Sequence, residues 1–307
     1  MSRYLAIDLG GTYIKYTVFD DTYRTYTNDS FPTPSIPESF LKNVLELVEQ
    51  MNQAHGIKGI AISSAGFINV RTGDNKDFSI GENFTTYNLL SEIKKKYDLP
   101  VVIENDSNCA AIGEQVTGLG KRYQDYCLLT IGTDIGGAVV LNGALHRGSH
   151  YRAGEAGLTL IKKPGGSWEK AGGTSRLVKR VSQEIHQEID GYYVFRHLND
   201  DRVQRVYREW LEGVAAVVVN VILMIDPQAI LIGGGISAQE QFIEDLRGKV
   251  FTLCPNLEGE VVIRACQSGN DAGRIGALKL LLDADCQRCT RPEPSPPASF
   301  NTSSTDT

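Results

Sequence analysis

The stretch Val101–Ala111 places a group of short polar residues between a predicted strand and a predicted helix. Its first three residues are apolar and β-branched, as in a buried strand, and small helix-forming residues end it. Asp106 therefore falls where a strand ends, which is where open α/β sheets bind their ligands. This position favours Asp106 as a general base. A plain helix cap, made by Asp106 or Ser107, explains the stretch equally well.

Two segments, residues 4–20 and 127–143, share one pattern of an apolar strand, a glycine turn with a threonine, and a second apolar strand. Glycine lets the backbone bend sharply and bring its N–H groups close to an anion. Two such turns facing each other could hold one polyphosphate from both sides, although each alone also fits an ordinary β-hairpin. Asp8, at the end of the first strand, could hold Mg²⁺ directly or through water.

Helices and strands alternate along the rest of the chain, which predicts a mixed α/β fold. Helices are expected at residues 37–53, 89–97, 173–187, 207–225 and from 268 to about 283, a strand at 57–63, and a strand with a third glycine turn at 229–237. The helix at 37–53 is amphipathic, and that at 207–225 is apolar enough to be buried.

The composition is that of a globular protein, with 307 residues, 41% of them hydrophobic, and a net charge of -6. No basic block indicates nucleic acid or an anionic membrane as a partner. The longest apolar run, residues 214–225, is shorter than the roughly 20 residues that span a bilayer, and no signal-peptide pattern is present. We therefore expect a soluble, cytoplasmic protein.

The last segment, residues 286–307, is rich in Pro, Ser and Thr and is expected to be disordered. It begins with a Cys-x-x-Cys pair, Cys286 and Cys289. A redox or metal role for this pair stays open, but two free thiols in a cytoplasmic protein are the simpler interpretation.

Six short motifs follow one another in a specific order. They are Asp-x-Gly-Gly-Thr, Glu-Asn-Asp-x-Asn, Gly-Thr-x-Ile-Gly-Gly, Gly-Glu-x-Gly, Gly-Gly-Gly and Asn-Asp-Ala-Gly. From about Arg3 to Asp283 this order resembles the ROK family of sugar kinases and sugar-responsive repressors, within the actin-like ATPase superfamily. The chain looks most similar to the zinc-free branch that includes the β-glucoside kinases.

The resemblance implies two ribonuclease-H-like α/β domains with a ligand cleft between them. The N-terminal domain would span residues 1–108, completed by a C-terminal helix at 271–284, and the second domain would span 109–270. The implied reaction uses ATP and Mg²⁺ to phosphorylate the 6-hydroxyl of a hexose or β-glucoside. A homodimer is also implied.

The resemblance further assigns individual residues. Asp106 matches the catalytic base. The positions matching ATP and phosphate contacts are Asp8, Gly10, Gly11, Thr12, Lys15, Gly132, Thr133, Gly136, Gly137, Gly233, Gly234, Gly235, Asn270 and Ala272. The positions matching sugar contacts are Gly66, Asn83, Asn105, Asp106, Glu155 and Glu169.

The chain departs from the family pattern at two places. Most members carry a histidine where this chain has Leu158, followed by a zinc-binding cysteine cluster that is absent here. All zinc ligands are missing together, so we expect a zinc-free site, and an apolar residue at 158 suggests tolerance of a bulky aglycone. Asp134 stands in the second phosphate turn, where its charge would repel phosphate unless the side chain points away or helps to hold Mg²⁺.

Two alternatives to a β-glucoside kinase stay open. One is a glucokinase or an N-acetylhexosamine kinase of the same family. The other is a sugar-sensing regulator that does no chemistry. Regulators of this family usually carry a DNA-reading helix-turn-helix before the first motif, and here that motif already starts at Asp8. The sequence therefore favours the enzyme and no nucleic-acid partner.

Overall fold

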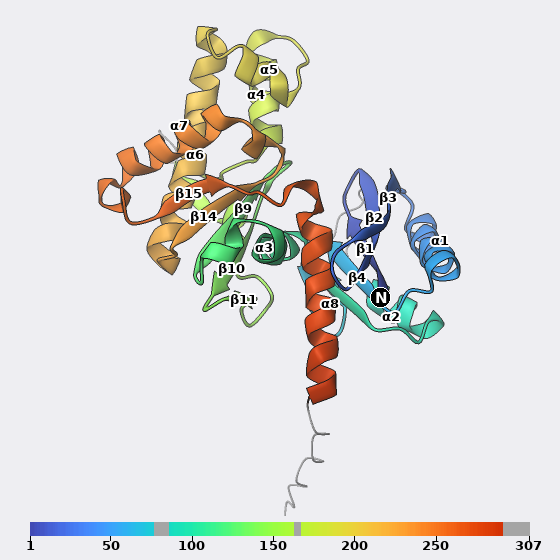
Figure 1. Cartoon of the computed structure of the whole chain (residues 1–307). Helices are drawn as coiled ribbons and strands as arrows, with labels where there is room; N and C mark the ends of the chain where they lie inside the picture. The colour runs from blue at the N-terminus through green and yellow to red at the C-terminus, as the bar shows by residue number, and fades with distance from the viewer. Residues whose placement is uncertain (77–85, 163–166, 291–307) are drawn as a thin grey trace, which may run out of the picture.

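The computed structural model describes residues 1–76, 86–162 and 167–290, and it contains two lobes, each built on a five-stranded sheet. Two helices, α3 (Asp106–Thr117) and α8 (Ala272–Thr290), run between the lobes (Figure 1). This arrangement confirms the expected α/β fold class with two similar units. Among the described residues, no helix has both the length and the apolar character to cross a bilayer.

The N-terminal sheet has the order β3-β2-β1-β4-β8. Its strands are β1 (Arg3–Leu9), β2 (Tyr13–Asp20), β3 (Thr25–Pro32), β4 (Ile60–Ser64) and β8 (Val101–Asn105). The first three form an antiparallel meander, whereas β1, β4 and β8 run parallel. One face packs against helices α1 (Pro37–His55) and α2 (Leu89–Lys96), and the other packs against α8.

The C-terminal sheet repeats this topology with the order β11-β10-β9-β14-β15. Its strands are β9 (Tyr126–Ile131), β10 (Ile135–Leu141), β11 (Ala144–His146), β14 (Ala229–Gly233) and β15 (Val262–Ala265). The helices of this lobe are α4 (Thr174–Ile185), α5 (Gly191–Arg196), α6 (Asp201–Ile225) and α7 (Glu240–Leu253). Strand order and direction match the first sheet position by position.

Alternation of side chains along the strands divides the core into layers. On β9, Leu129 and Ile131 point into the large core under α6, while Tyr126 and Leu128 point towards α3. On β1, the small Ala6 faces α8, which lets that helix approach closely. Both sheets are therefore buried on two faces, as near-continuous apolar strands require.

Small elements carry the connections around these sheets. They are β5 (Phe67–Ile68), β6 (Asn75–Lys76), β7 (Thr86–Tyr87), β12 (Leu160–Lys162), β13 (Trp168–Lys170), and the 3₁₀ turns η1 (Leu119–Arg122), η2 (Ala156–Leu158), η3 (Gly235–Ala238), η4 (Pro255–Leu257) and η5 (Gly269–Asp271). None of these strands or the helix α5 was expected from the sequence, because segments this short carry too few residues to show a period.

Two helix boundaries differ from expectation. Helix α6 begins at Asp201 rather than near 207, because the Asp200 side chain caps its first turn and the added turns are amphipathic rather than uniformly apolar. Helix α8 continues to Thr290, past the expected end near 283. Residues 286–290 of the segment expected to be disordered are therefore helical, which corrects that expectation, and residues 291–307 lie outside the described residues.

The contact between α3 and α8 is a backbone contact. A Cβ atom at Gly276 would overlap the Cys109 carbonyl, and one at Gly113 would overlap the Ala272 carbonyl. Glu114 reinforces the junction from α3, because its side chain accepts hydrogen bonds from the backbone N–H groups of Gln267 (2.9 Å) and Ser268 (2.6 Å). The two helices thus form one tightly packed connector between the lobes.

We expect Gly276→Ala to lower the free energy of unfolding by about 1–3 kcal/mol, because the added methyl group forces the two helix backbones apart. Denaturant unfolding measures this change. Gly248→Ala is the matched control, since Gly248 is an exposed glycine inside α7 with no atom near its Cβ position, and it should stabilise by about 0.5–1 kcal/mol. Equal effects of the two substitutions would contradict the close packing.

Candidate functional site

Asp106 is the first residue of α3, directly after strand β8. The helix cap is Asn105, whose Oδ1 accepts hydrogen bonds from the N–H groups of Ser107 (2.9 Å) and Asn108 (3.1 Å). The interpretation of Asp106 or Ser107 as the cap is therefore wrong. The Asp106 carboxyl accepts local hydrogen bonds from the Ser107 N–H (2.7 Å) and the Ser107 hydroxyl (3.4 Å), and the residue is exposed.

Asn105 is engaged on both sides of its amide. Besides capping α3, its Nδ2 donates to the carbonyl oxygen of Gly66 at 3.2 Å. Since an amide nitrogen has two hydrogens, one remains for a sugar hydroxyl. Asn105 therefore has a structural role as the cap of α3, whereas the sequence predicts only a sugar contact for it.

The Asp106 carboxyl is accessible to solvent but has protein atoms around it. Desolvation raises its pKa above the ordinary value; the Ser107 N–H opposes this, and the negative charge of Asp8 adds to it. A raised pKa makes the ionised carboxylate a stronger base, which suits proton abstraction from an alcohol.

The first glycine turn joins β1 to β2 and carries Gly10, Gly11 and Thr12. Thr33 holds it from behind, donating its N–H to the Thr12 carbonyl (2.9 Å) and its hydroxyl to the Gly10 carbonyl (2.7 Å). With these carbonyls held, the exposed Gly11 and Thr12 form the outer edge of the turn.

Asp8 lies at the base of this turn, where β1, β2 and β4 meet. It is paired across the hairpin with Lys15, and its Oδ1 accepts a hydrogen bond from Ser63 Oγ at 2.8 Å. A Cβ atom at Gly273 would lie 3.7 Å from the same oxygen, so the start of α8 lies beside Asp8. Ser63 was not among the residues expected at the site.

The second glycine turn, Gly132 to Asp134, joins β9 to β10 and lies close to α3. A Cβ atom at Gly136 would meet Ser107 Oγ at 2.5 Å, and Ser107 Oγ itself lies 3.0 Å from Thr130 Oγ1. The turn is also joined to α4, because the Thr174 N–H donates to the Gly132 carbonyl at 2.7 Å.

The second turn and the strand β10 that follows it make further contacts. Gly137 packs against the Gly154 carbonyl, which brings the loop carrying Glu155 onto the strand. Thr133 and Asp134 are exposed, and the backbone carbonyl of Asp134 accepts a hydrogen bond from Gly132. The structure thus places the second turn, Glu155 and the start of α3 around β10.

The third glycine turn follows β14. Gly234 has φ +86° and packs on the Ile131 carbonyl, so this turn lies against the end of β9 and next to the second turn. Gly233 ends β14, and Gly235 begins η3. Asn270 is exposed in η5, and Ala272 is buried at the start of α8.

Glu155 shares an electrostatic environment with Asp106. The pKa of Glu155 is raised to about 7, mainly by desolvation and also by the charge of Asp106, while the charge of Arg152 opposes the rise. Desolvated carboxyl groups whose pKa is also raised by a neighbouring negative charge are typical of functional sites.

Glu104 was missed by sequence reasoning, although it stands in the motif next to Asn105. It is buried at the end of β8 and accepts hydrogen bonds from the Asn105 N–H (2.9 Å) and Asn108 Nδ2 (2.9 Å). It also forms an ion pair with Arg147 of the other lobe, at 2.5 Å from Nε. A charged residue at the end of an apolar strand was the available signal for Glu104; nothing in the sequence marked Arg147.

Two expected sugar contacts are not placed at this centre. Glu169 lies on β13, forms an ion pair with Arg176 (2.6 Å) and lines a pocket beside α6. Asn83 lies outside the described residues. Leu158 is exposed at the end of η2. Within the described ranges, no group of three or more His, Cys, Asp or Glu residues is arranged to hold a metal ion.

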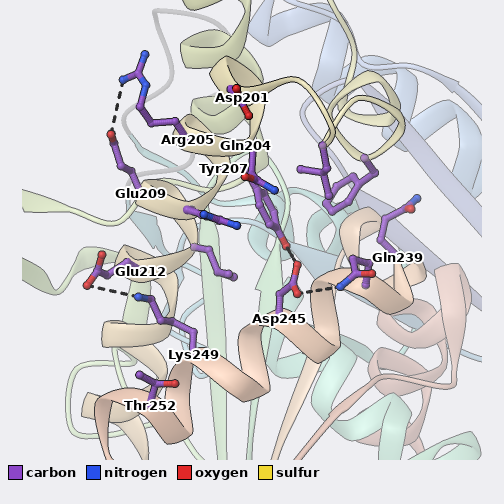
Figure 2. Close-up of a pocket in the computed structure, with 15 residues that line it drawn as sticks. Asp201, Gln204, Arg205, Tyr207, Glu209, Glu212, Gln239, Asp245, Lys249 and Thr252 are labelled. Carbon is purple, nitrogen blue, oxygen red and sulfur yellow. Dashed lines mark hydrogen bonds and ion pairs between the residues drawn. The ribbon is translucent and has the colours of Figure 1, made fainter.

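A larger pocket, of about 980 Å³, lies between α6 and α7, away from these residues (Figure 2). Its polar side chains pair with one another. The Tyr207 hydroxyl donates to Asp245 (2.9 Å), and Lys249 lies 3.7 Å from Glu212. None of the expected site residues lines this pocket, so its large volume does not make it the candidate active site.

Comparisons with known proteins agree with this geometry. The model of the ROK family matches residues 4–284. A β-glucoside kinase of Listeria innocua is 34% identical over 72% of this chain and 78% of its own length. A glucokinase of Streptomyces coelicolor is 27% identical over 93% and 99%. A ROK family protein of Streptococcus pneumoniae, solved with sucrose, is 28% identical, with a TM-score of 0.82 over 93% of this chain and 99% of that one.

The two like α/β lobes with paired glycine turns, together with the kinases named among these relatives, identify an ATP-dependent carbohydrate kinase of the actin-like ATPase fold. The chain belongs to the ROK family. The resemblance found in its motifs is thereby confirmed over nearly the whole described chain.

We expect Glu155→Gln to stabilise the protein at neutral pH but not in acid. The folded-state pKa of Glu155, about 7, exceeds its ordinary value of 4.5, so the folded protein keeps the proton to higher pH than the unfolded chain does. Wild-type stability therefore falls as pH rises from about 4.5 to about 7, and the amide removes this loss. Thermal unfolding of both proteins at pH 4.5, 6 and 8 measures it, with the exposed Glu258→Gln as control. A pH-independent difference would contradict the assigned desolvation.

Proposed function

We propose that this sugar kinase transfers the γ-phosphoryl group of ATP to the 6-hydroxyl of a hexose or β-glucoside, with Asp106 as the general base. One observation carries the proposal most directly: Asp106 starts a helix whose first turn contacts the second glycine turn, and its pKa responds to Asp8 beside the first. A carboxylate between two phosphate-binding turns is the arrangement that phosphorylation of an alcohol needs.

In this mechanism, Asp106 accepts the proton of the sugar hydroxyl as the oxygen attacks the γ-phosphorus. Such a base contributes about 10²–10⁴-fold to the rate. The backbone N–H groups of the two glycine turns, together with Lys15 and Thr133, receive the charge that spreads over the phosphoryl oxygens. The third turn and the start of α8, with Asn270 and Ala272, hold the adenosine end.

The residues present suit Mg²⁺. Mg²⁺ in kinases takes one or two carboxylates, substrate phosphates and water. Asp8 offers a carboxylate at the phosphate end of the site, with one oxygen held by Ser63. When bound there, Mg²⁺ neutralises charge on the phosphates, and Asp8 holds it directly or through water.

For the sugar, we propose contacts from Gly66, Asn105 and Glu155, with Asn83 from the segment outside the described residues. Glu155 near neutrality can donate or accept a hydrogen bond, which suits a ring of hydroxyl groups. The β-glucoside kinase relative favours a glucoside with an aglycone, and the glucokinase relative keeps free glucose as the second candidate.

The remaining proposals rest on family likeness. We propose that the protein is a cytoplasmic homodimer. We also propose that its N-terminal domain spans residues 1–108 and includes the helix at 271–284, and that its C-terminal domain spans residues 109–270. The packing of α8 on β1 and β4 supports this return. A non-catalytic sugar sensor is the weaker candidate, because nothing in such a role requires a desolvated base beside two phosphate turns.

Asp106→Asn should lower kcat by about 10²–10⁴-fold, because the amide keeps an acceptor oxygen but cannot take a proton. Sugar affinity should stay within about tenfold of wild type. A coupled ADP-release assay with glucose and cellobiose measures turnover, and calorimetry measures sugar binding. Asp98→Asn, a change of an exposed carboxylate outside every motif, is the control and should behave as wild type. Near-wild-type turnover of Asp106→Asn would remove the base from its role.

A further inference from the structure

A third, smaller pocket, of about 310 Å³, lies between the two lobes. The N-terminal lobe contributes Phe67 and Asp74 to its lining, and the C-terminal lobe contributes the segment from Ser149 to Arg152. Arg152 places its guanidinium group 4.9 Å from the centre of the Phe67 ring, so the two sides touch across the pocket. The pocket is thus a feature of both lobes together.

This pocket shares its walls with the proposed sugar site. Phe67 directly follows Gly66, whose carbonyl accepts a hydrogen bond from Asn105. Arg152 belongs to the same short loop as Glu155 and lowers its pKa. A group attached to a sugar that contacts Gly66 and Glu155 therefore has this pocket beside it.

The loop from Ser149 to Arg152 is held in place from the catalytic strand. Arg147, just before it, forms the ion pair with the buried Glu104, which also binds the backbone of Asn105. Because one carboxylate holds both the start of this loop and the residue next to Asp106, the pocket wall and the base keep a defined relative position.

The pocket offers hydrogen-bonding groups that are not used within the protein. In the described part of the chain, the side chains of Ser149, His150 and Tyr151 have no hydrogen-bond partner, whereas Asp74 is paired with Thr72. Hydroxyl and imidazole groups next to aromatic faces suit a ligand that has both hydroxyl groups and apolar C–H faces. A sugar ring has this combination.

We propose that this pocket is a subsite for the second sugar ring of a β-linked disaccharide, the ring that does not receive the phosphate. This rests on the proposed function and names its substrate class. The volume lies at the lower end of the roughly 300–1,000 Å³ that ligand pockets have, which suits one ring rather than a longer chain. The sucrose-bound relative shows that a family member can hold a disaccharide.

The test compares kcat/KM for cellobiose and for glucose in three variants. Ser149→Trp fills the pocket and should lower kcat/KM for cellobiose at least about tenfold, with glucose within about twofold. His150→Ala removes one hydrogen-bonding group and should raise KM for cellobiose about 2–10-fold. His146→Ala, an exposed histidine on β11 that does not line the pocket, is the matched control and should change neither substrate. Retained glucose turnover shows that each variant is folded.

Several outcomes would overturn the subsite. They are equal losses on both sugars in Ser149→Trp, no loss on either, or a wild-type enzyme that phosphorylates glucose but neither phosphorylates nor is inhibited by cellobiose. A strong preference for an aryl β-glucoside, also lost in Ser149→Trp, would assign the pocket to aryl groups instead. If wild type phosphorylates no sugar, the proposed function fails, and calorimetric binding of cellobiose to wild type and Ser149→Trp then decides the subsite separately.

Discussion

The close contact between α3 and α8 is the constraint on which the rest of the structure depends. Gly113 and Gly276 let the two backbones meet without side chains between them. Helix α3 therefore lies against the C-terminal sheet on one side and against α8 on the other. Because Asp106 is the first residue of α3, the packing that joins the lobes also sets the position of the proposed base.

Three consecutive residues at the end of β8 and the start of α3 have different roles around the proposed base. Glu104 is buried and connects the two lobes through Arg147, Asn105 satisfies the free N–H groups of the helix, and Asp106 stays accessible. A buried carboxylate that kept fewer partners would cost several kcal/mol, which explains why Glu104 is surrounded by donors. The structural and the chemical roles thus fall on separate side chains.

Electrostatics connect this strand end with the opposite lobe. Asp8, Asp106 and Glu155 come from different elements. Besides desolvation, the charge of Asp8 raises the pKa of Asp106, and the charge of Asp106 raises the pKa of Glu155. Bringing phosphates to this region would add further negative charge. In the proposed mechanism, Lys15, a divalent cation and the backbone N–H groups of the glycine turns would balance it.

The sequence by itself determined the fold class, the repeated strand–turn–strand units and the position of Asp106 at a strand end, because these depend on local period, glycine turns and motif order. Its motifs also marked Glu155 and the glycine turns as candidate site residues, and the family resemblance added Gly66. Only the tertiary structure decided that Asn105 is the helix cap, that Glu104 pairs with Arg147, and that Phe67 and Arg152 enclose a pocket. Those contacts join residues far apart in the chain, and no local pattern records which distant partner a side chain meets.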